Sequence, residues 1–205
     1  MKRFSDSVFI NCPFDKRYQT IFDAKVFAIF DCGFLPRTAK EENDSGAVRI
    51  EKISKIIREC KYGIHDLSRT ELGRNNSLPR FNMPLELGLF LGAKKYGSGV
   101  QKRKNTLIID TKPHRYQEYI SDIAGQDIGM YKANELVTII STVRDWLNAS
   151  QTETIPGGIL ITNRFERFKK ELPMICKAAG LTKKELTYND YATFVSNWCQ
   201  MNPLN

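Results

Sequence analysis

Short β-rich runs alternate with segments of helical periodicity along most of this chain, and that alternation constrains its fold more than any other feature. Strands that alternate with helices pair in parallel, because each crossover helix returns the chain to the same edge of the sheet. The sequence therefore predicts an α/β protein with a flavodoxin-like (Rossmannoid) parallel five-stranded sheet. The expected strands are residues 7–11, 34–38, 62–67, 106–110 and 128–131.

Helices are marked by apolar residues that recur three and four positions apart. Pro156-Gly157-Gly158 interrupts this periodicity, and two further helices follow it, over residues 164–179 and 189–199. The expected helices before the interruption are residues 18–32, 48–60, 84–95 and 133–147. We therefore expect an α/β domain over residues 1–149, a linker over 150–158 and a small C-terminal helical cap over 159–205.

Composition narrows the class of protein. Of the 205 residues, 41% are hydrophobic and 26% are charged, which is typical of a globular chain with a packed core. No apolar run approaches the roughly 18 residues of a membrane span, and the N-terminus lacks the apolar segment of a signal peptide. Five scattered cysteines without a Cys-x-x-Cys pair, and only two histidines, argue against a disulfide framework or a metal site. We expect a cytoplasmic protein without metal or membrane contact.

The net charge of +8 favours anionic partners such as nucleotides or nucleic acid, although a basic surface also keeps a protein in solution. The stretch 178–186 is weakly similar to the turn of a helix-turn-helix. Residues 151–205, however, carry only seven basic and five acidic side chains. That excess is small for a phosphate-binding surface, so we expect no nucleic-acid partner.

Several motifs of nucleotide binding and hydrolysis are missing from the sequence. No Gly-x-Gly-x-x-Gly follows the first strand, and there is no Walker A loop, Gly-x-Ser-x-Gly or His-Glu-x-x-His. The glycines in residues 96–99 follow a helix instead of opening one, so they predict a helix end. Conventional dinucleotide-binding, P-loop and α/β-hydrolase chemistry is therefore not expected.

In open α/β sheets, ligands bind outside the carboxyl ends of the strands, where the strand order reverses. Three segments meet there: the loop after the first strand, the end of the third strand at Asp66, and the start of the next helix with Glu86. Asp66 and Glu86 are the candidate catalytic residues. The candidate ligand-binding residues are Asn11, Cys12, Pro13, Phe14, Asp15, Tyr18, Asn82 and Met83.

Glu86 is the leading candidate. We expect it in the first turn of a helix that begins at Pro84, where unpaired N–H groups and the helix dipole favour an ionised carboxylate. Such a carboxylate can attack an anomeric carbon or stabilise an oxocarbenium-like transition state. Acidic residues also occur in first turns for capping alone, so both interpretations stay open.

The other candidates also have structural alternatives. Asp66 could hold a ribose hydroxyl or cap the following loop, and Asn82 could orient Glu86 or act as a helix N-cap. Tyr18 could stack on a base or pack against the sheet edge. His65 precedes Asp66 in a strand and points to the opposite face, so we interpret it as structural.

Three segments, Val8–Asp15, His65–Leu67 and Phe81–Gly88, together resemble one known group. They are similar to the nucleoside 2-deoxyribosyltransferase-like families, which are structurally akin to Toll/interleukin-receptor (TIR) domains. Pro13-Phe14-Asp15 resembles the loop after the family's first strand. Glu86-Leu87-Gly88 resembles the helix start that carries the family's nucleophilic glutamate. The resemblance covers roughly residues 7–147.

This resemblance implies a Rossmann-like fold and cleavage or transfer at the N-glycosidic bond of a nucleoside, nucleotide or NAD-like molecule. Glu86 would be the nucleophile, while Asp66 and the loop 11–15 would place the sugar and base. No cofactor is implied, because NAD or a nucleotide would be the substrate or ligand. Kinship with TIR proteins implies self-association into a homo-oligomer and a role as a bacterial defence effector.

Two hypotheses from different classes follow. The first is an enzyme, either an N-glycosidase that hydrolyses NAD or nucleosides or a deoxyribosyltransferase-like protein. It predicts that Glu86 lies in a cleft beside Asp66. The second is a non-catalytic, nucleotide-binding TIR-like module for signalling or assembly, in which the same crevice holds its ligand without turnover.

Overall fold

The computed structural model of the chain describes residues 3–70 and 80–203. Its strands are β1 (Ser7–Asn11), β2 (Leu35–Arg37), β3 (Tyr62–Asp66), β4 (Asn105–Asp110) and β5 (Ile128–Met130). Its α-helices are α1 (Gln19–Asp31), α2 (Arg49–Glu59), α3 (Asn82–Tyr96), α4 (Leu136–Asn148), α5 (Gly158–Ala178) and α6 (Tyr188–Met201). Short 3-10 helices cover Phe4–Asp6, Gly99–Arg103, Arg115–Glu118 and Ser121–Ile123. Each predicted strand is present, with both ends within one residue of the expected position.

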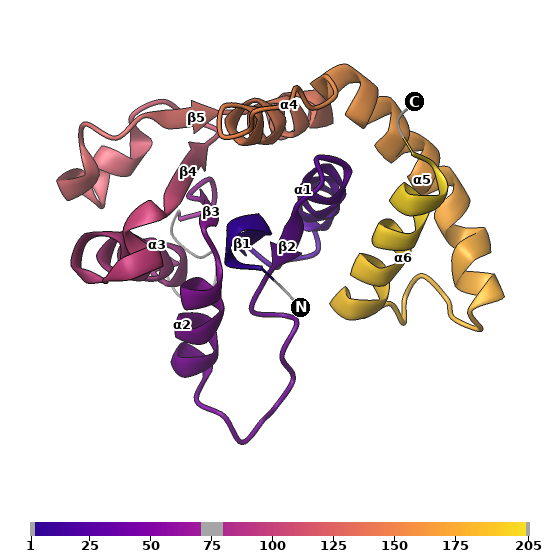
Figure 1. Cartoon of the computed structure of the whole chain (residues 1–205), viewed down its shortest axis with the longest axis horizontal. Coiled ribbons are helices and arrows are strands. Elements are labelled where there is room, and N and C mark those ends of the chain that lie inside the picture. Colours follow the sequence, from indigo (N-terminus) through magenta and orange to yellow (C-terminus); the bar gives the residue numbers. More distant parts are fainter. Residues whose placement is uncertain (1–2, 71–79, 204–205) are drawn as a thin grey trace.

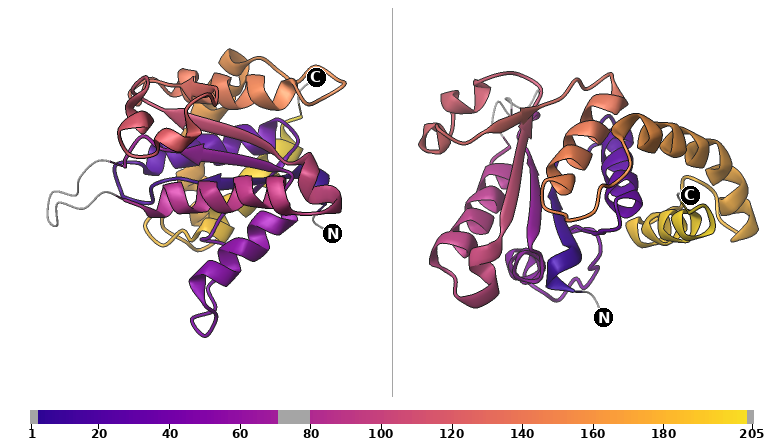
Figure 2. Two further views of the ribbon diagram at one scale, coloured as in Figure 1. Left: turned by 90° about the vertical axis from the view of Figure 1, so that its left-hand side faces the viewer. Right: turned by 45° about the horizontal axis from the view of Figure 1, so that its top comes forward.

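The strands form one parallel sheet in the order β2-β1-β3-β4-β5, which confirms the flavodoxin-like prediction. The chain runs from β1 to β2 on one side and then crosses to β3 on the other, so the strand order reverses between β1 and β3. Helices α1 and α4 cover one face of the sheet (Figure 1). Helices α2 and α3 cover the opposite face (Figure 2).

Side chains alternate along each strand and divide the core between these two faces. In β1, Val8 packs on the α1/α4 face, whereas Phe9 packs against α2 and against Phe90 of α3. In β3, the His65 ring lies edge-on to Phe9 and Phe90, with centroid distances of 5.9 and 5.1 Å. His65 therefore belongs to the α2/α3 face, and its neighbour Asp66 belongs to the other.

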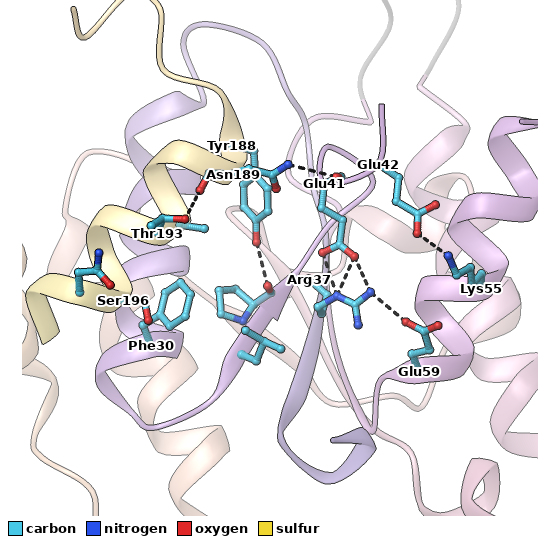
Figure 3. A pocket seen from close by; sticks show the side chains of 14 residues that line it. Phe30, Arg37, Glu41, Glu42, Lys55, Glu59, Tyr188, Asn189, Thr193 and Ser196 are labelled. Atoms are coloured by element: carbon cyan, nitrogen blue, oxygen red, sulfur yellow. Dashed lines mark hydrogen bonds and ion pairs between the residues drawn. The ribbon is translucent and has the colours of Figure 1, made fainter. Parts of the chain in front are cut away.

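β2 lies at one edge of the sheet, and side chains of the same protein occupy that edge. Pro36 has no N–H to offer a further strand, and its carbonyl accepts a hydrogen bond of 2.8 Å from Tyr188 of α6. The Arg37 side chain bonds to Glu41 and, at 2.9 Å, to Glu59 (Figure 3). These contacts protect the strand from pairing with another chain.

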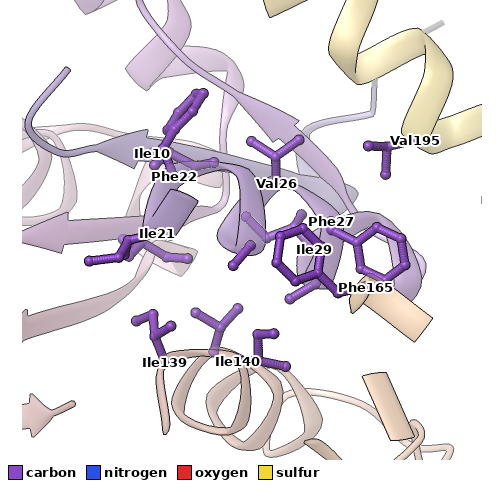
Figure 4. Packing of buried hydrophobic residues seen from close by; sticks show 14 of the residues in the cluster. Ile10, Ile21, Phe22, Val26, Phe27, Ile29, Ile139, Ile140, Phe165 and Val195 are labelled. Carbon is purple, nitrogen blue, oxygen red and sulfur yellow. The ribbon is translucent and has the colours of Figure 1, made fainter. Parts of the chain in front are cut away.

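Helix α1 is buried almost all round, because α5 and α6 cover the side that faces away from the sheet. The Phe27 ring of α1 lies 5.4 Å from that of Phe165 and 5.6 Å from that of Trp198. Arg164 of α5 also forms an ion pair of 2.8 Å with Asp31 at the end of α1. The predicted C-terminal helices are thus present and share one hydrophobic cluster with the sheet (Figure 4).

Helix α5 begins at Gly158, six residues before its predicted start at Arg164. Gly158 does not break the helix, because close packing requires it there: a Cβ would lie 2.2 Å from Oγ of Ser141 in α4. With 21 residues α5 is long. Within the described residues, however, neither α5 nor any other helix is both long and apolar enough to cross a membrane.

Candidate functional site

A cleft of about 600 Å³ opens beyond the carboxyl end of β1, between the following loop and the starts of α2 and α3. It lies at the switch point of the sheet, where open α/β sheets bind ligands. It is lined by Asn11, Cys12, Pro13, Phe14, Asp15, Arg49, Arg80, Phe81, Asn82, Met83 and Glu86. The structure thus brings together eight of the ten residues that the sequence singled out.

Asn11, the last residue of β1, fixes the two sides of the cleft to each other. Its Nδ2 donates to the carbonyl of Met83 in α3 at 2.8 Å and lies 3.0 Å from Nδ1 of His65. Burial lowers the pKa of His65 to about 3, so the ring is neutral and its Nδ1 accepts the second hydrogen bond. Asn11 therefore holds the start of α3 in place, and with it Glu86.

Helix α3 begins at Asn82, two residues earlier than predicted, so the expected position of Glu86 in the first turn is wrong. Phe81 occupies the N-cap position instead of Asn82. Pro84 is the third helical residue. The N–H groups of the first turn have no intrahelical partner, so the missing N–H of Pro84 costs the helix no hydrogen bond. Glu86 is the fifth residue and lies past the unpaired N–H groups that were expected to stabilise its charge.

The Glu86 side chain is buried and opens into the cleft. Its exposed fraction is 8%, and no described residue donates a hydrogen bond to its carboxylate. Burial raises the pKa of Glu86 from its ordinary value of 4.5 to about 7, and the charge of Arg49 limits the rise. A carboxyl group that titrates near neutral pH can act as an acid, a base or a nucleophile.

Guanidinium groups give the cleft a positive charge. Arg69 and Arg80 both bond to Asp15, at 2.9 and 3.1 Å, and although partial burial opposes them, they hold the pKa of Asp15 below its usual value. Arg49 forms no ion pair with a described residue. Two guanidinium groups and two carboxyl groups line the cleft, so these lining charges cancel when Glu86 is ionised and leave one positive charge when it is protonated. Arg69, bound to Asp15 beside the cleft, adds a third guanidinium.

Two phenylalanine rings line the same cleft. Phe81 has an exposed fraction of 63%, which is high for a large apolar side chain. Phe14 is half-buried, packs edge-on against Phe22 at 5.7 Å, and has Nζ of Lys40 at 4.6 Å from its ring centre. An exposed ring beside cationic groups is the composition of a surface on which a nucleobase stacks.

Asp66 does not line the cleft, although the sequence placed it beside Glu86. It is fully buried on the α1/α4 face, where it accepts bonds from Lys25 at 2.6 Å and from Tyr131 and the Ser68 N–H at 2.9 Å. Burial opposes its ionisation, but the charge of Lys25 and the hydrogen bonds hold the pKa of Asp66 below its ordinary value. Asp66 is therefore one half of a buried ion pair behind the cleft.

Tyr18 belongs to the same buried network. Its side chain is fully buried, and its hydroxyl donates to Asp66 and accepts from Lys25. Of the two interpretations of Tyr18, the structure shows the packed one, with no ring surface open to a base.

Cys12 supplies the cleft with a neutral thiol. Burial raises the pKa of Cys12 to about 12, well above the range in which a thiolate forms at physiological pH. Among the described residues, no group of three or more His, Cys, Asp or Glu side chains is arranged to hold a metal ion. The reactive groups of the cleft are thus the Glu86 carboxyl and the guanidinium groups around it.

The sequence interpretation missed Arg49, Arg80 and Phe81. Arg80 and Phe81 fall between the predicted strand 62–67 and the predicted helix 84–95, in a segment of which residues 71–79 lie outside the described residues. One signal could have found them. In a parallel α/β sheet, the helix that follows each strand starts at the same edge where the strands end, so charged or aromatic side chains at those starts are candidates.

A second cleft, of about 640 Å³, runs along β2 between α6 and α2. Its charged side chains bond to one another in Figure 3: Arg37 bonds to Glu41 and Glu59, and Lys55 bonds to Glu42 at 2.8 Å. Charges that are already paired offer a ligand little, and this cleft follows a sheet edge instead of the strand ends. The cleft that contains Glu86 is therefore the candidate functional site.

No protein-family model, curated protein or solved structure matches this chain. The fold and the cleft themselves define its class: an α/β protein with a doubly wound parallel sheet and an electropositive cleft at the switch point. The similarity of three short segments to the nucleoside 2-deoxyribosyltransferase-like and TIR families stays a prediction. A function for this protein must therefore be inferred from the chemistry of the cleft.

Proposed function

We propose that this protein cleaves or transfers at the N-glycosidic bond of a nucleotide, nucleoside or NAD-like molecule, with Glu86 as the nucleophile. The supporting observation is the Glu86 carboxyl group, which is 8% exposed, lacks a hydrogen-bond donor among the described residues and opens into the cleft. Burying a carboxylate without a partner destabilises a fold. A substrate carbon that carries developing positive charge is the partner such a group lacks.

The reaction has two steps. An oxygen of the ionised Glu86 carboxylate bonds to the anomeric carbon while the bond from that carbon to the base breaks, and the electron pair leaves with the base. Water or a second base then attacks the same carbon, releases the carboxylate and gives up any excess proton to solvent. Because the first step needs the ionised form of Glu86, activity rises as the pH passes through about 7.

The cleft suits a base that leaves without being protonated first. Asp15 is held ionised by Arg69 and Arg80, and burial raises the pKa of the Cys12 thiol to about 12, so neither group donates a proton readily. A ring that already carries positive charge at its glycosidic nitrogen, such as the nicotinamide of NAD, leaves as a neutral molecule. NAD-like substrates therefore suit these residues best, because no residue has to protonate the leaving base.

The test is incubation of the full chain with NAD, ATP and a panel of nucleosides, followed by chromatography for free base. The Glu86→Gln variant, which keeps the shape of the side chain, runs alongside. Base release by the native protein and not by the variant supports the proposal. Equal release by the variant would contradict the role of Glu86, and no release from any compound would contradict the activity.

One observation favours a second function, a non-catalytic nucleotide-binding module. Apart from Glu86, the described cleft presents only the ion-paired carboxylate of Asp15, because Asp66 lies behind it. Such a module predicts that nucleotides raise the melting temperature of both the native protein and Glu86→Gln, without base release. If no nucleotide shifts the melting temperature, this alternative fails.

A further inference from the structure

The rim of the cleft that holds Arg49 carries groups that can bind an anion. Arg49 is the first residue of α2, is exposed, lines the cleft, and forms no hydrogen bond or ion pair with a described residue. The N-cap residue is Val48, whose side chain has no acceptor for the first N–H groups of the helix. This end of α2 therefore combines a guanidinium that no described residue pairs with the positive end of a helix dipole, which Glu51 in the same turn partly offsets.

A second observation, independent of the helix end, points to a ligand in the same cleft. The buried Glu86 carboxyl group opens into the cleft without a donor among the described residues, at 8% exposure. Arg80, the other cation that lines the cleft, is bound to Asp15 at 3.1 Å. Among the described cations that line the cleft, Arg49 is thus the one whose whole guanidinium is left for a ligand.

We propose that Arg49 and the amino-terminal end of α2 form a phosphate subsite, so that the cleft selects a nucleotide over the corresponding nucleoside. The inference rests on the proposed function for its choice of ligand class, with the sugar at Glu86 and the base on the exposed Phe81 ring. A guanidinium binds two phosphate oxygens at once, and a helix N-terminus adds N–H donors.

Arg49 and Glu86 are coupled, which gives the proposal a second consequence. Arg49 lowers the pKa of Glu86, and that carboxyl group titrates near pH 7. A phosphate on Arg49 cancels this effect and favours protonated Glu86, so binding takes up a proton near neutral pH. A nucleotide whose phosphates do not titrate in this range, such as NAD, should therefore bind more weakly as the pH rises through about 7.

The test is calorimetric titration of the full-length Glu86→Gln variant with AMP, adenosine and NAD, which measures binding without turnover. A charge-assisted contact contributes about 1.5–3 kcal/mol, so AMP and NAD should each bind about 10- to 100-fold more tightly than adenosine. Arg49→Met in the same background should remove that advantage and leave adenosine binding unchanged. The matched control is Arg58→Met, which removes an equal charge from the exposed far end of α2 and should change nothing.

Each other outcome overturns the subsite. Equal affinity for AMP and adenosine, equal weakening of both by Arg49→Met, or an equal effect of Arg58→Met would show that Arg49 does not hold a phosphate. Absence of binding by all three compounds would overturn the subsite together with its ligand class. Because binding is measured in a variant without turnover, a missing glycosidic activity in the native protein leaves the result interpretable.

Discussion

Replacing Glu86 by glutamine should stabilise the protein increasingly as the pH rises. Burial raises the pKa of Glu86 to about 7 in the folded chain, whereas a glutamate of the unfolded chain keeps its ordinary value of 4.5. Between these values, the unfolded chain releases a proton that the folded chain keeps. The stability contributed by a raised carboxyl pKa is therefore fully present below 4.5 and is lost as the pH rises through about 7. Glutamine has no such proton to lose.

The size of the effect follows from the two pKa values. One pKa unit corresponds to about 1.4 kcal/mol, so a rise from 4.5 to about 7 corresponds to about 3 kcal/mol. The residue is 8% exposed and its carboxyl group opens into the cleft, so solvent there reduces the effect somewhat. We expect the unfolding free energy of Glu86→Gln, relative to the native protein, to grow by about 2–3 kcal/mol between pH 4 and pH 8.

Urea unfolding at pH 4, 5, 6, 7 and 8, followed by tryptophan fluorescence, measures both free energies. Asp23, whose pKa burial raises to about 6, affects the native protein and the variant alike and cancels in the difference. Glu153→Gln, at an exposed position, is the matched control and should show no trend with pH. A difference between Glu86→Gln and native protein that is constant with pH, or that shrinks as pH rises, would refute the buried-carboxyl reasoning.

Three further predictions concern stability, each measured by the shift in urea unfolding. Lys25→Met leaves the buried Asp66 charge unpaired and should cost about 3–5 kcal/mol. Adding Asp66→Asn should recover part of that loss, and full additivity of the two changes would contradict the pairing. Gly158→Ala places a methyl group 2.2 Å from the hydroxyl of Ser141 and should cost about 1–3 kcal/mol. Gly92→Ala, inside α3 where the new methyl meets nothing within 4 Å beyond the adjacent residues and backbone of its own helix, should instead stabilise by about 0.5–1 kcal/mol. Equal effects of the two alanines would contradict the packing explanation.

The sheet could be predicted because every strand is a local signal. Each short apolar run ends at a polar residue, a proline or a glycine, and the helices between the runs allow only parallel pairing. The start of α5 could not be predicted in the same way. In the sequence Gly158 has the appearance of a breaker, whereas its role is to let α5 approach Ser141 of α4, a contact between two helices.

The sequence could predict which segments form the candidate site, but not which side chains within it contact one another. The loop 11–15 and the start of α3 meet because the strand order brings β1 and β3 together. However, α3 starts two residues earlier than predicted, so Glu86 lies beyond the unpaired N–H groups of the first turn. Its charge is therefore not stabilised by the helix end, and burial raises its pKa instead. Arg49 could be found as a charged side chain at the start of α2, but its place in the same cleft as Glu86 depends on how α2 lies beside α3.

The two candidate carboxyl groups lie near the same edge of the sheet, but their pKa values shift in opposite directions. Asp66 faces the α1/α4 side, where it is fully buried. Lys25 and several hydrogen-bond donors hold its pKa low there. Glu86 lies on the α2/α3 side, where burial raises its pKa to about 7 and no described residue donates to it. Only the second group keeps a pKa that a substrate can shift, and only the second opens into the cleft. Asp66 therefore stabilises the wall behind the cleft, and Glu86 is the group at which its chemistry should be sought.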